Sequence, residues 1–256
     1  MKITMSTVFI VGTAGSGKST LVSTLMEWLE RNQYSVVTVN LDPAVEYLPY
    51  IADIDIRDFV SARKLMRKYK LGPNASIIAA VDMMLLNIER IREEVQALEA
   101  TYILIDTPGQ MELFAFRSTG SLLIDKLSSD KTIVIFVIDA TQARTPTGFV
   151  SSILLSLSTQ FRFNKPQINV LNKIDLLDKS EVERILLWSE EAEELQNALR
   201  IETESLGKLE LSVRISEIIN IMESLSKIIP ISAKTGEGMD ELCREIEQVL
   251  RTYDER

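Results

Sequence analysis

Residues 12–19 (GTAGSGKS) restrict the fold of this chain more than any other segment. They match the pattern G-x-x-x-x-G-K-[ST], follow the β-branched run 8–11 and precede a helical pattern from Thr20 to about Arg31. A strand, a glycine-rich turn and a helix in this order bring several main-chain N–H groups and the positive end of a helix to one point. The segment therefore predicts a phosphate-binding loop within an α/β fold.

Each residue type in this loop has a chemical reason. The glycines let the backbone curl so that successive N–H groups face one anion. Lys18 is expected to reach the β- and γ-phosphate oxygens, and Ser19 to ligate Mg²⁺ through its hydroxyl. The alternative is a glycine-rich turn that binds nothing, which the flanking strand and helix disfavour. The predicted phosphate-binding residues are Gly12, Gly15, Ser16, Gly17, Lys18, Ser19 and Thr20.

Further short apolar runs occur at residues 36–39, 102–105, 133–138, 168–171 and 228–231, with helical patterns between most of them. Apolar runs without strict alternation suit strands that are buried on both faces. The pattern predicts a three-layer α/β fold with a mainly parallel sheet flanked by helices. In such sheets ligands bind beyond the carboxyl ends of the strands, and the motifs considered next all fall there.

The chain is expected to form one domain over residues 1–256 with two helical insertions. The first, at about 57–98, reads as two helices broken at residues 71–74, and the second, at about 178–227, is charged and helical and contains Trp188. No internal repeat, low-complexity tract or Gly/Ser linker suggests a domain boundary. The second insertion reads as helices packed on the edge of the core. The alternative is a surface that binds a partner or lines a dimer.

Composition excludes several classes of function. The 37 acidic residues exceed the 28 Lys and Arg, and no basic block is present, so a nucleic-acid partner is not expected. The chain has no histidine, so a metal would be bound by oxygen, which points to Mg²⁺. A lone Cys243 suits a reducing compartment. With no signal sequence and no apolar run near the ~20 residues of a membrane span, we expect a cytoplasmic protein without a membrane partner.

Two strand ends carry acidic residues suited to a metal and a reacting water. Asp106 opens the segment D-T-P-G-Q after the run 102–105 and is expected to hold a Mg²⁺-bound water. Gly109 is expected to touch the γ-phosphate through its N–H, and Gln110 to orient the attacking water. Asp42, before a proline at the end of the run 36–39, is a candidate Mg²⁺-water ligand or water-orienting base. The alternatives are a plain turn at 106–109 and a cap or turn at Asp42.

Residues 172–175 (NKID) form the most discriminating motif. The Asp175 carboxylate can accept hydrogen bonds from guanine N1–H and the 2-amino group, where adenine has no donors. An unpaired buried carboxylate costs ~1–3 kcal/mol or more, so the motif predicts rejection of ATP. Lys173 is expected to lie along the base face and Asn172 to tie this loop to the phosphate loop. After the last run, Ser232-Ala233-Lys234 offers a main-chain N–H to guanine O6, although each tripeptide alone would fit an ordinary loop.

In this order the motifs resemble those of the P-loop GTPases, and Gly72-Pro73-Asn74 narrows the resemblance to the GPN-loop GTPase family. That family is a dimeric branch of the SIMIBI class, related to the signal-recognition and partition-type NTPases. The resemblance covers essentially the whole chain, without departures at the motifs. From the residues alone, 72–74 is a helix connector in which Gly72 follows one helix and Asn74 caps the next, near Ala75. The resemblance implies more: in a homodimer Asn74 would enter the partner's active site and supply polar contacts near the γ-phosphate.

The function predicted from sequence is the Mg²⁺-dependent reaction of GTP with water to give GDP and phosphate. Lys18, Asp42, Asn74, Asp106 and Gln110 are the predicted catalytic residues, and Ser19, Asp42 and Asp106 the predicted metal residues. The resemblance implies a homodimeric switch acting on a protein client, since eukaryotic relatives serve RNA polymerase assembly and nuclear import. Two alternatives remain: a metallochaperone-type GTPase, disfavoured by the lack of His and C-x-x-C, and a GTP-binding module with negligible turnover, disfavoured by Gln110 and Asp42.

Overall fold

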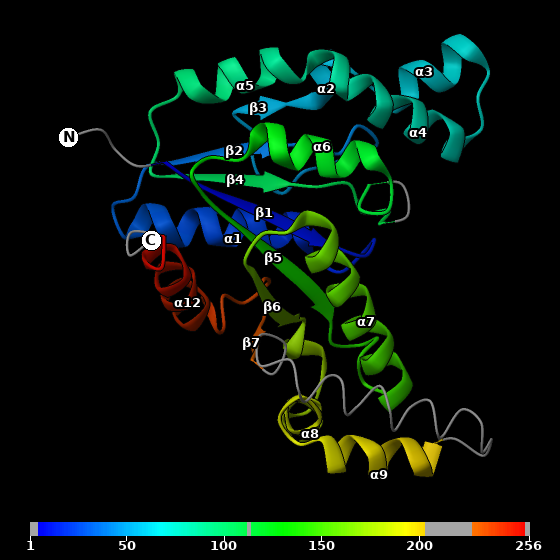
Figure 1. Ribbon diagram of the computed structural model, residues 1–256, viewed down its shortest axis with the longest axis vertical. Helices are drawn as coiled ribbons and strands as arrows, with labels where there is room; N and C mark the ends of the chain where they lie inside the picture. Colours follow the sequence, from blue (N-terminus) through cyan, green and yellow to red (C-terminus); the bar gives the residue numbers. More distant parts are fainter. Residues whose placement is uncertain (1–4, 112–113, 203–226, 254–256) are drawn as a thin grey trace.

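The computed structural model describes residues 5–111, 114–202 and 227–253. Within these residues one seven-stranded sheet, all of whose strand pairs are parallel, runs in the order β3-β2-β4-β1-β5-β6-β7, with helices on both faces (Figure 1). This confirms the predicted three-layer α/β fold. The strands are β1 (Ser6–Gly12), β2 (Val36–Asn40), β3 (Ile54–Asp55), β4 (Tyr102–Asp106), β5 (Lys131–Asp139), β6 (Gln167–Asn172) and β7 (Ile228–Ile231).

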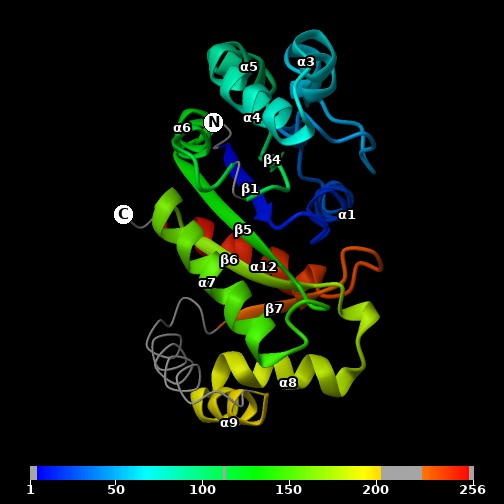
Figure 2. The same cartoon turned by 90° about the vertical axis from the view of Figure 1, so that its right-hand side faces the viewer.

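The apolar strands divide the core into two layers, because successive side chains of a strand point to opposite faces of a sheet. On β1, Val8 and Ile10 face α1 (Lys18–Arg31) and α12 (Met239–Arg251). Phe9 and Val11 face the opposite layer, which contains α6 (Ser118–Leu127) and α7 (Pro146–Phe163). Figure 2 shows these two layers on either side of the sheet. All four β1 side chains are fully buried, which explains the absence of polar alternation.

The first insertion differs in detail from its prediction. It contains α2 (Ile56–Phe59), α3 (Ala62–Tyr69), α4 (Pro73–Met84), a 3₁₀ turn η1 (Leu85–Asn87) and α5 (Ile88–Ala97), rather than two helices. The break near 71–74 is present, but its capping was predicted wrongly. Lys70, at φ 53°, ends α3 in the left-handed region, and Gly72, not Asn74, is the N-cap of α4. Pro73 suits the first helical position because its missing N–H would have no partner there.

The short edge strand β3 escaped prediction because two residues give no periodicity to detect. The described part of the second insertion forms α8 (Lys179–Glu190) and α9 (Ala192–Glu202) after the 3₁₀ turn η2 (Ile174–Leu176). Trp188 is buried against Phe149 of α7, with ring centroids 5.9 Å apart, as expected for helices packed on the core edge. Residues 203–226 of this insertion lie outside the described residues.

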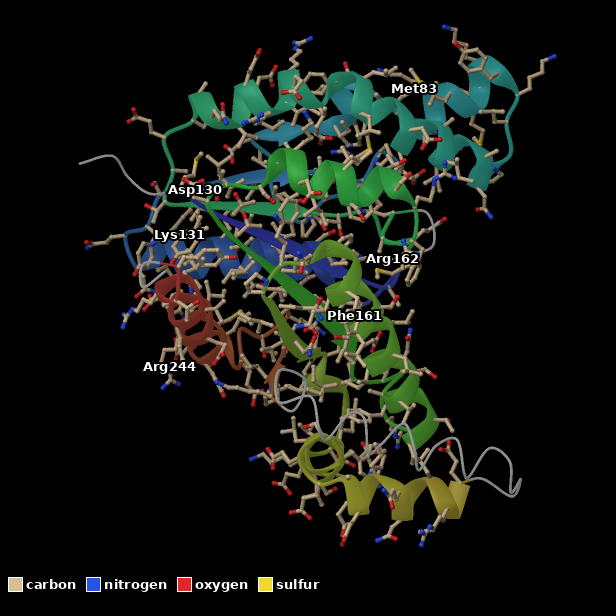
Figure 3. The ribbon with its side chains drawn as sticks, in the orientation of Figure 1. Met83, Asp130, Lys131, Phe161, Arg162 and Arg244 are labelled. Atoms are coloured by element: carbon tan, nitrogen blue, oxygen red, sulfur yellow. The ribbon has the colours of Figure 1, made fainter. Side chains whose placement is uncertain are left out.

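The strand order creates the place where a ligand can bind. From β1 the chain leads through α1 to β2, whereas β5, β6 and β7 extend from the other side of β1. A crevice forms beyond the carboxyl ends of the strands where the order reverses in this way. The outward faces of the helices carry polar side chains, such as that of Arg244 on α12, while Met83 lies on the outer surface of α4 (Figure 3).

Candidate functional site

The glycine loop between β1 and α1 has the backbone geometry of an anion cradle. Gly15 and Gly17 have φ values of 79° and 96°, in the left-handed region where glycine is favoured. Gly17 is the N-cap of α1, so the first N–H groups of that helix open toward the loop. Ser16 is fully buried and its Oγ has no hydrogen-bond partner within the described structure. An orphaned hydroxyl within a curled backbone suits an anionic ligand.

Lys18 lies under this loop and is 6% exposed. Its Nζ donates to Thr13 O at 3.0 Å, which holds the ammonium within the cradle. Burial lowers the pKa of Lys18, against the opposing effect of the nearby carboxylates of Asp106 and Asp42. Gly109 approaches the same group, since a Cβ added there would lie 3.3 Å from Lys18 Nζ. The loop after β4 and the glycine loop therefore meet at the Lys18 ammonium group.

Asp106 ends β4 beside Lys18 and is 1% exposed. Burial raises the pKa of Asp106 to about 6, although the Ser19 hydroxyl, Lys18 and Tyr50 act to lower it. Its Oδ2 accepts a hydrogen bond from Tyr50 Oη at 3.1 Å, whereas its Oδ1 has no hydrogen-bond partner within the described structure. A buried free carboxylate oxygen next to a hydroxyl suits the water shell of a hard cation.

Magnesium fits this oxygen-rich donor set. The described residues contain no group of three His, Cys, Asp or Glu side chains arranged to hold a metal by themselves. A P-loop metal needs no such group, because Ser or Thr hydroxyl, phosphate oxygens and water supply most of its ligands. Ser19, on the first turn of α1, and the carboxylates of Asp42 and Asp106 are the residues that would hold it.

Asp42 stands where the chain leaves β2. Its N–H donates to Asn40 Oδ1 at 2.9 Å, and its own Oδ1 accepts from Ala44 N at 2.8 Å. One carboxylate oxygen of Asp42 thus closes a local turn, while the negative charge of the Asp42 carboxylate acts to raise the pKa of both Lys18 and Asp106.

Gln110 follows Gly109 and is partly buried, and its main-chain carbonyl accepts a hydrogen bond from Phe114 N at 3.1 Å. The roles of Asp42 and Gln110 in orienting water remain predictions.

Asn172 joins the glycine loop to the two loops predicted to read the base. Its side chain is 1% exposed, and its Nδ2 donates to Ser16 O at 2.8 Å. Its Oδ1 accepts from Ala233 N at 2.9 Å. Gly17 is required beside it, because a Cβ there would lie 2.3 Å from Asn172 Nδ2. One amide therefore spans three segments that lie far apart in the sequence.

A pocket of about 310 Å³ opens beside this amide. Asp175 lies on its rim, and Asp175 Oδ1 accepts a hydrogen bond from Ser232 Oγ at 2.7 Å. Contrary to the buried carboxylate assumed from sequence, Asp175 is exposed here, so a bound base would have to cover it. Ala233 N donates to Asn172 Oδ1 and Ser232 N donates to Glu237 O, so two of the three main-chain N–H groups of Ser232-Ala233-Lys234 are already engaged. The pocket is lined by Gly17, Thr20, Asn172, Lys173, Asp175, Leu176, Ala233 and Lys234.

Asn74 is not part of this constellation. It is exposed in the first turn of α4, and Figures 1 and 2 show the α3–α4 hairpin projecting from the molecule away from α1. Asn74 is not among the residues that line the base pocket.

Two contacts of the site were missed from sequence. Tyr50 lies in the loop after β2 and was not singled out, because a tyrosine in a loop carries no motif. Asp139 ends β5 and holds Lys173 Nζ at 2.6 Å. Its position at the end of an apolar strand, like that of Asp106, was the signal that could have identified it.

No helix in the described part of the chain has the length and apolar character needed to cross a membrane.

A family model described as a conserved hypothetical ATP-binding protein matches residues 10–252. GPN-loop GTPase 1 of Dictyostelium discoideum is 31% identical over 251 residues, which are 96% of this chain but only 62% of the relative. A GPN-loop GTPase of Pyrococcus abyssi is 34% identical and is matched over 92% of this chain and 93% of its own.

A solved structure agrees with this likeness. The crystal structure of a GTPase in apo form from Pyrococcus abyssi superposes with a TM-score of 0.82 at 33% identity, over 95% of this chain and 96% of that one. The similarity therefore covers nearly the whole length of both chains.

Proposed function

The chain belongs to the GPN-loop GTPase family, and we propose that it binds GTP with Mg²⁺ and hydrolyses it to GDP and phosphate. The observation that carries this proposal is the Asn172 side chain, which joins the phosphate loop at Ser16 to the base-reading loop at Ala233. Phosphates seated on the glycine loop would place a purine in the adjoining pocket, beside Asp175. The Asp175 carboxylate favours guanine, which distinguishes this proposal from the ATP binding named in the family description.

Catalysis would come from position and charge rather than from a covalent intermediate. Lys18 would neutralise charge on the β- and γ-phosphates, which is supported by its burial and by the approach of Gly109 to its ammonium group. Magnesium, held by Ser19 and through water by Asp42 and Asp106, would supply further charge neutralisation when bound. Gln110 follows Gly109 directly and is the residue we assign to orienting the attacking water.

A phosphate-release assay on the purified chain tests hydrolysis. We expect turnover of GTP and little of ATP, and Gln110→Ala should lower kcat while leaving the affinity for a non-hydrolysable GTP analogue near the wild-type value. Gln160→Ala, a glutamine on α7, is a matched control. Tight GTP binding without phosphate release would instead identify a binding module with negligible turnover.

We further propose that the active form is a homodimer in which Asn74 acts on the partner's γ-phosphate. Support comes from the exposure of Asn74 on the projecting α3–α4 hairpin, and from the family. The dimer would act as a nucleotide-controlled switch on a protein client. A cytoplasmic location is consistent with the single cysteine.

Mixing two inactive variants tests the action in trans. Asn74→Ala keeps its own phosphate loop, and Lys18→Ala keeps its own Asn74. A mixed dimer contains one complete site, so we expect GTP hydrolysis to reappear on mixing and subunit exchange. If the mixture stays as inactive as its components while mixed dimers are detected, Asn74 does not act across the interface.

A further inference from the structure

Asp139 is a buried acid that the proposed reaction does not use. It is the last residue of β5, pairs in register with Asn172 of β6, and is 5% exposed. Its Oδ1 accepts two hydrogen bonds from Thr141, from N at 2.9 Å and from Oγ1 at 2.7 Å. These two hydrogen bonds fix the plane of the carboxylate, and its other oxygen, Oδ2, faces the end of β6.

Oδ2 receives the ammonium group of Lys173 at 2.6 Å. Lys173 leaves β6 with φ 71°, a left-handed conformation that is uncommon for a residue with a side chain. Burial would raise the pKa of Asp139, but the hydrogen bonds from Lys173 and Thr141 lower it overall, so the acid is charged at neutral pH. A lysine stem otherwise has high rotamer entropy and is one of the most mobile side chains in a protein.

The clamped stem lies beside the base pocket. Lys173 lines that pocket together with Gly17 and Asp175, and a Cβ added at Gly17 would lie 4.0 Å from Lys173 Cε. The Lys173 ammonium points to Asp139, so its methylene groups are the part that a base face can meet. This contact is apolar and does not read the exocyclic groups of a purine.

We propose that Asp139 is a positioning residue for base binding: by holding the Lys173 ammonium, it orders the lysine stem as one wall of the base pocket before nucleotide arrives. The inference rests on the proposed binding of guanine nucleotide. The proposal assigns two tasks to different residues around the base pocket. Asp139 and Lys173 set the affinity for any base of the right shape, whereas Asp175 sets the preference for guanine.

Calorimetric titration with GDP and with IDP, whose base lacks the 2-amino group, tests this division. Asp139→Ala should weaken both nucleotides by the same factor, about three- to tenfold, which corresponds to ordering one long side chain on binding. Asp139→Asn keeps an oxygen for Lys173 and should lie between Asp139→Ala and wild type. Asp175→Ala should instead reduce the preference for GDP over IDP. Glu89→Gln, which breaks a surface pair with Lys126, is the control and should change neither affinity.

A double-mutant cycle distinguishes positioning from a general structural role. If Asp139 acts through Lys173, Asp139→Ala should have no further effect on GDP affinity in a Lys173→Ala background. The thermal midpoint of each variant shows whether folding has changed. A lower midpoint with unchanged GDP and IDP affinities for Asp139→Ala and Asp139→Asn would overturn the proposal, as would unequal losses for the two nucleotides. If the wild-type protein bound neither nucleotide, the proposed function itself would fail.

Discussion

Replacing Asn172 by alanine should damage both folding and nucleotide binding, because one amide supports three segments. The substitution leaves Ser16 O and Ala233 N without their partners in a buried position. Each unsatisfied group costs about 1–3 kcal/mol, so the sum lies between about 2 and 6 kcal/mol. Because the base pocket adjoins the amide and can admit water, we expect the lower half, about 2–4 kcal/mol. That is a large part of the 5–15 kcal/mol typical of a folded domain.

Urea unfolding in the absence of nucleotide measures this loss, and calorimetry measures the affinity for GDP. The matched control is Asn169→Ala, on the same strand and also 1% exposed, whose Oδ1 accepts from Ser156 Oγ and which contacts neither loop by a hydrogen bond of the described structure. The control should lower stability and leave GDP affinity unchanged, whereas Asn172→Ala should lower both. A stability change below about 0.5 kcal/mol for Asn172→Ala, with wild-type GDP affinity, would refute the reasoning.

Three further predictions concern single groups. Tyr50→Phe removes the hydroxyl that donates to buried Asp106, and urea unfolding should show a loss of about 1.5–3 kcal/mol, the value of a hydrogen bond to a charged group. Gly17→Ala should weaken GDP binding far more than Gly15→Ala, because a Cβ collides with Asn172 only at Gly17; equal calorimetric effects would contradict the packing. Burial raises the pKa of Cys243 to about 12, so Ellman's reagent at pH 8 should label the thiol slowly in the native protein and promptly in denaturant.

The ends of the buried strands were accessible to sequence analysis because each strand is a continuous apolar run followed by a polar motif. Asp106, Asn172 and Ser232 could therefore be placed at one edge of the sheet before any coordinates were known. The hydrogen bond between Asn172 and Ser16 joins residues 156 positions apart, and only the parallel order of β1, β5 and β6 brings them together.

What the sequence did not reveal has identifiable physical causes. Helix capping around residues 70–74 was misassigned because Lys70 adopts a left-handed conformation that is usual only for glycine and asparagine. Tyr50 belongs to an irregular loop, where no periodicity predicts which side chain turns inward. The exposure of Asp175 was missed because the motif N-K-x-D identifies a residue type and its spacing, not how deeply its loop is covered. A catalytic role for Asn74 came only from the family resemblance, because the residues 72–74 by themselves indicate a helix connector.

The central claim is that two joined loops recognise a triphosphate and a guanine base together. Calorimetric titration of the wild-type chain with GTP and ATP analogues, in the presence of Mg²⁺, tests it most directly. The account predicts that the GTP analogue binds at least about a hundredfold more tightly, since adenine leaves the Asp175 carboxylate without its two donors. Equal affinity for the two nucleotides, or no binding of either, would contradict it.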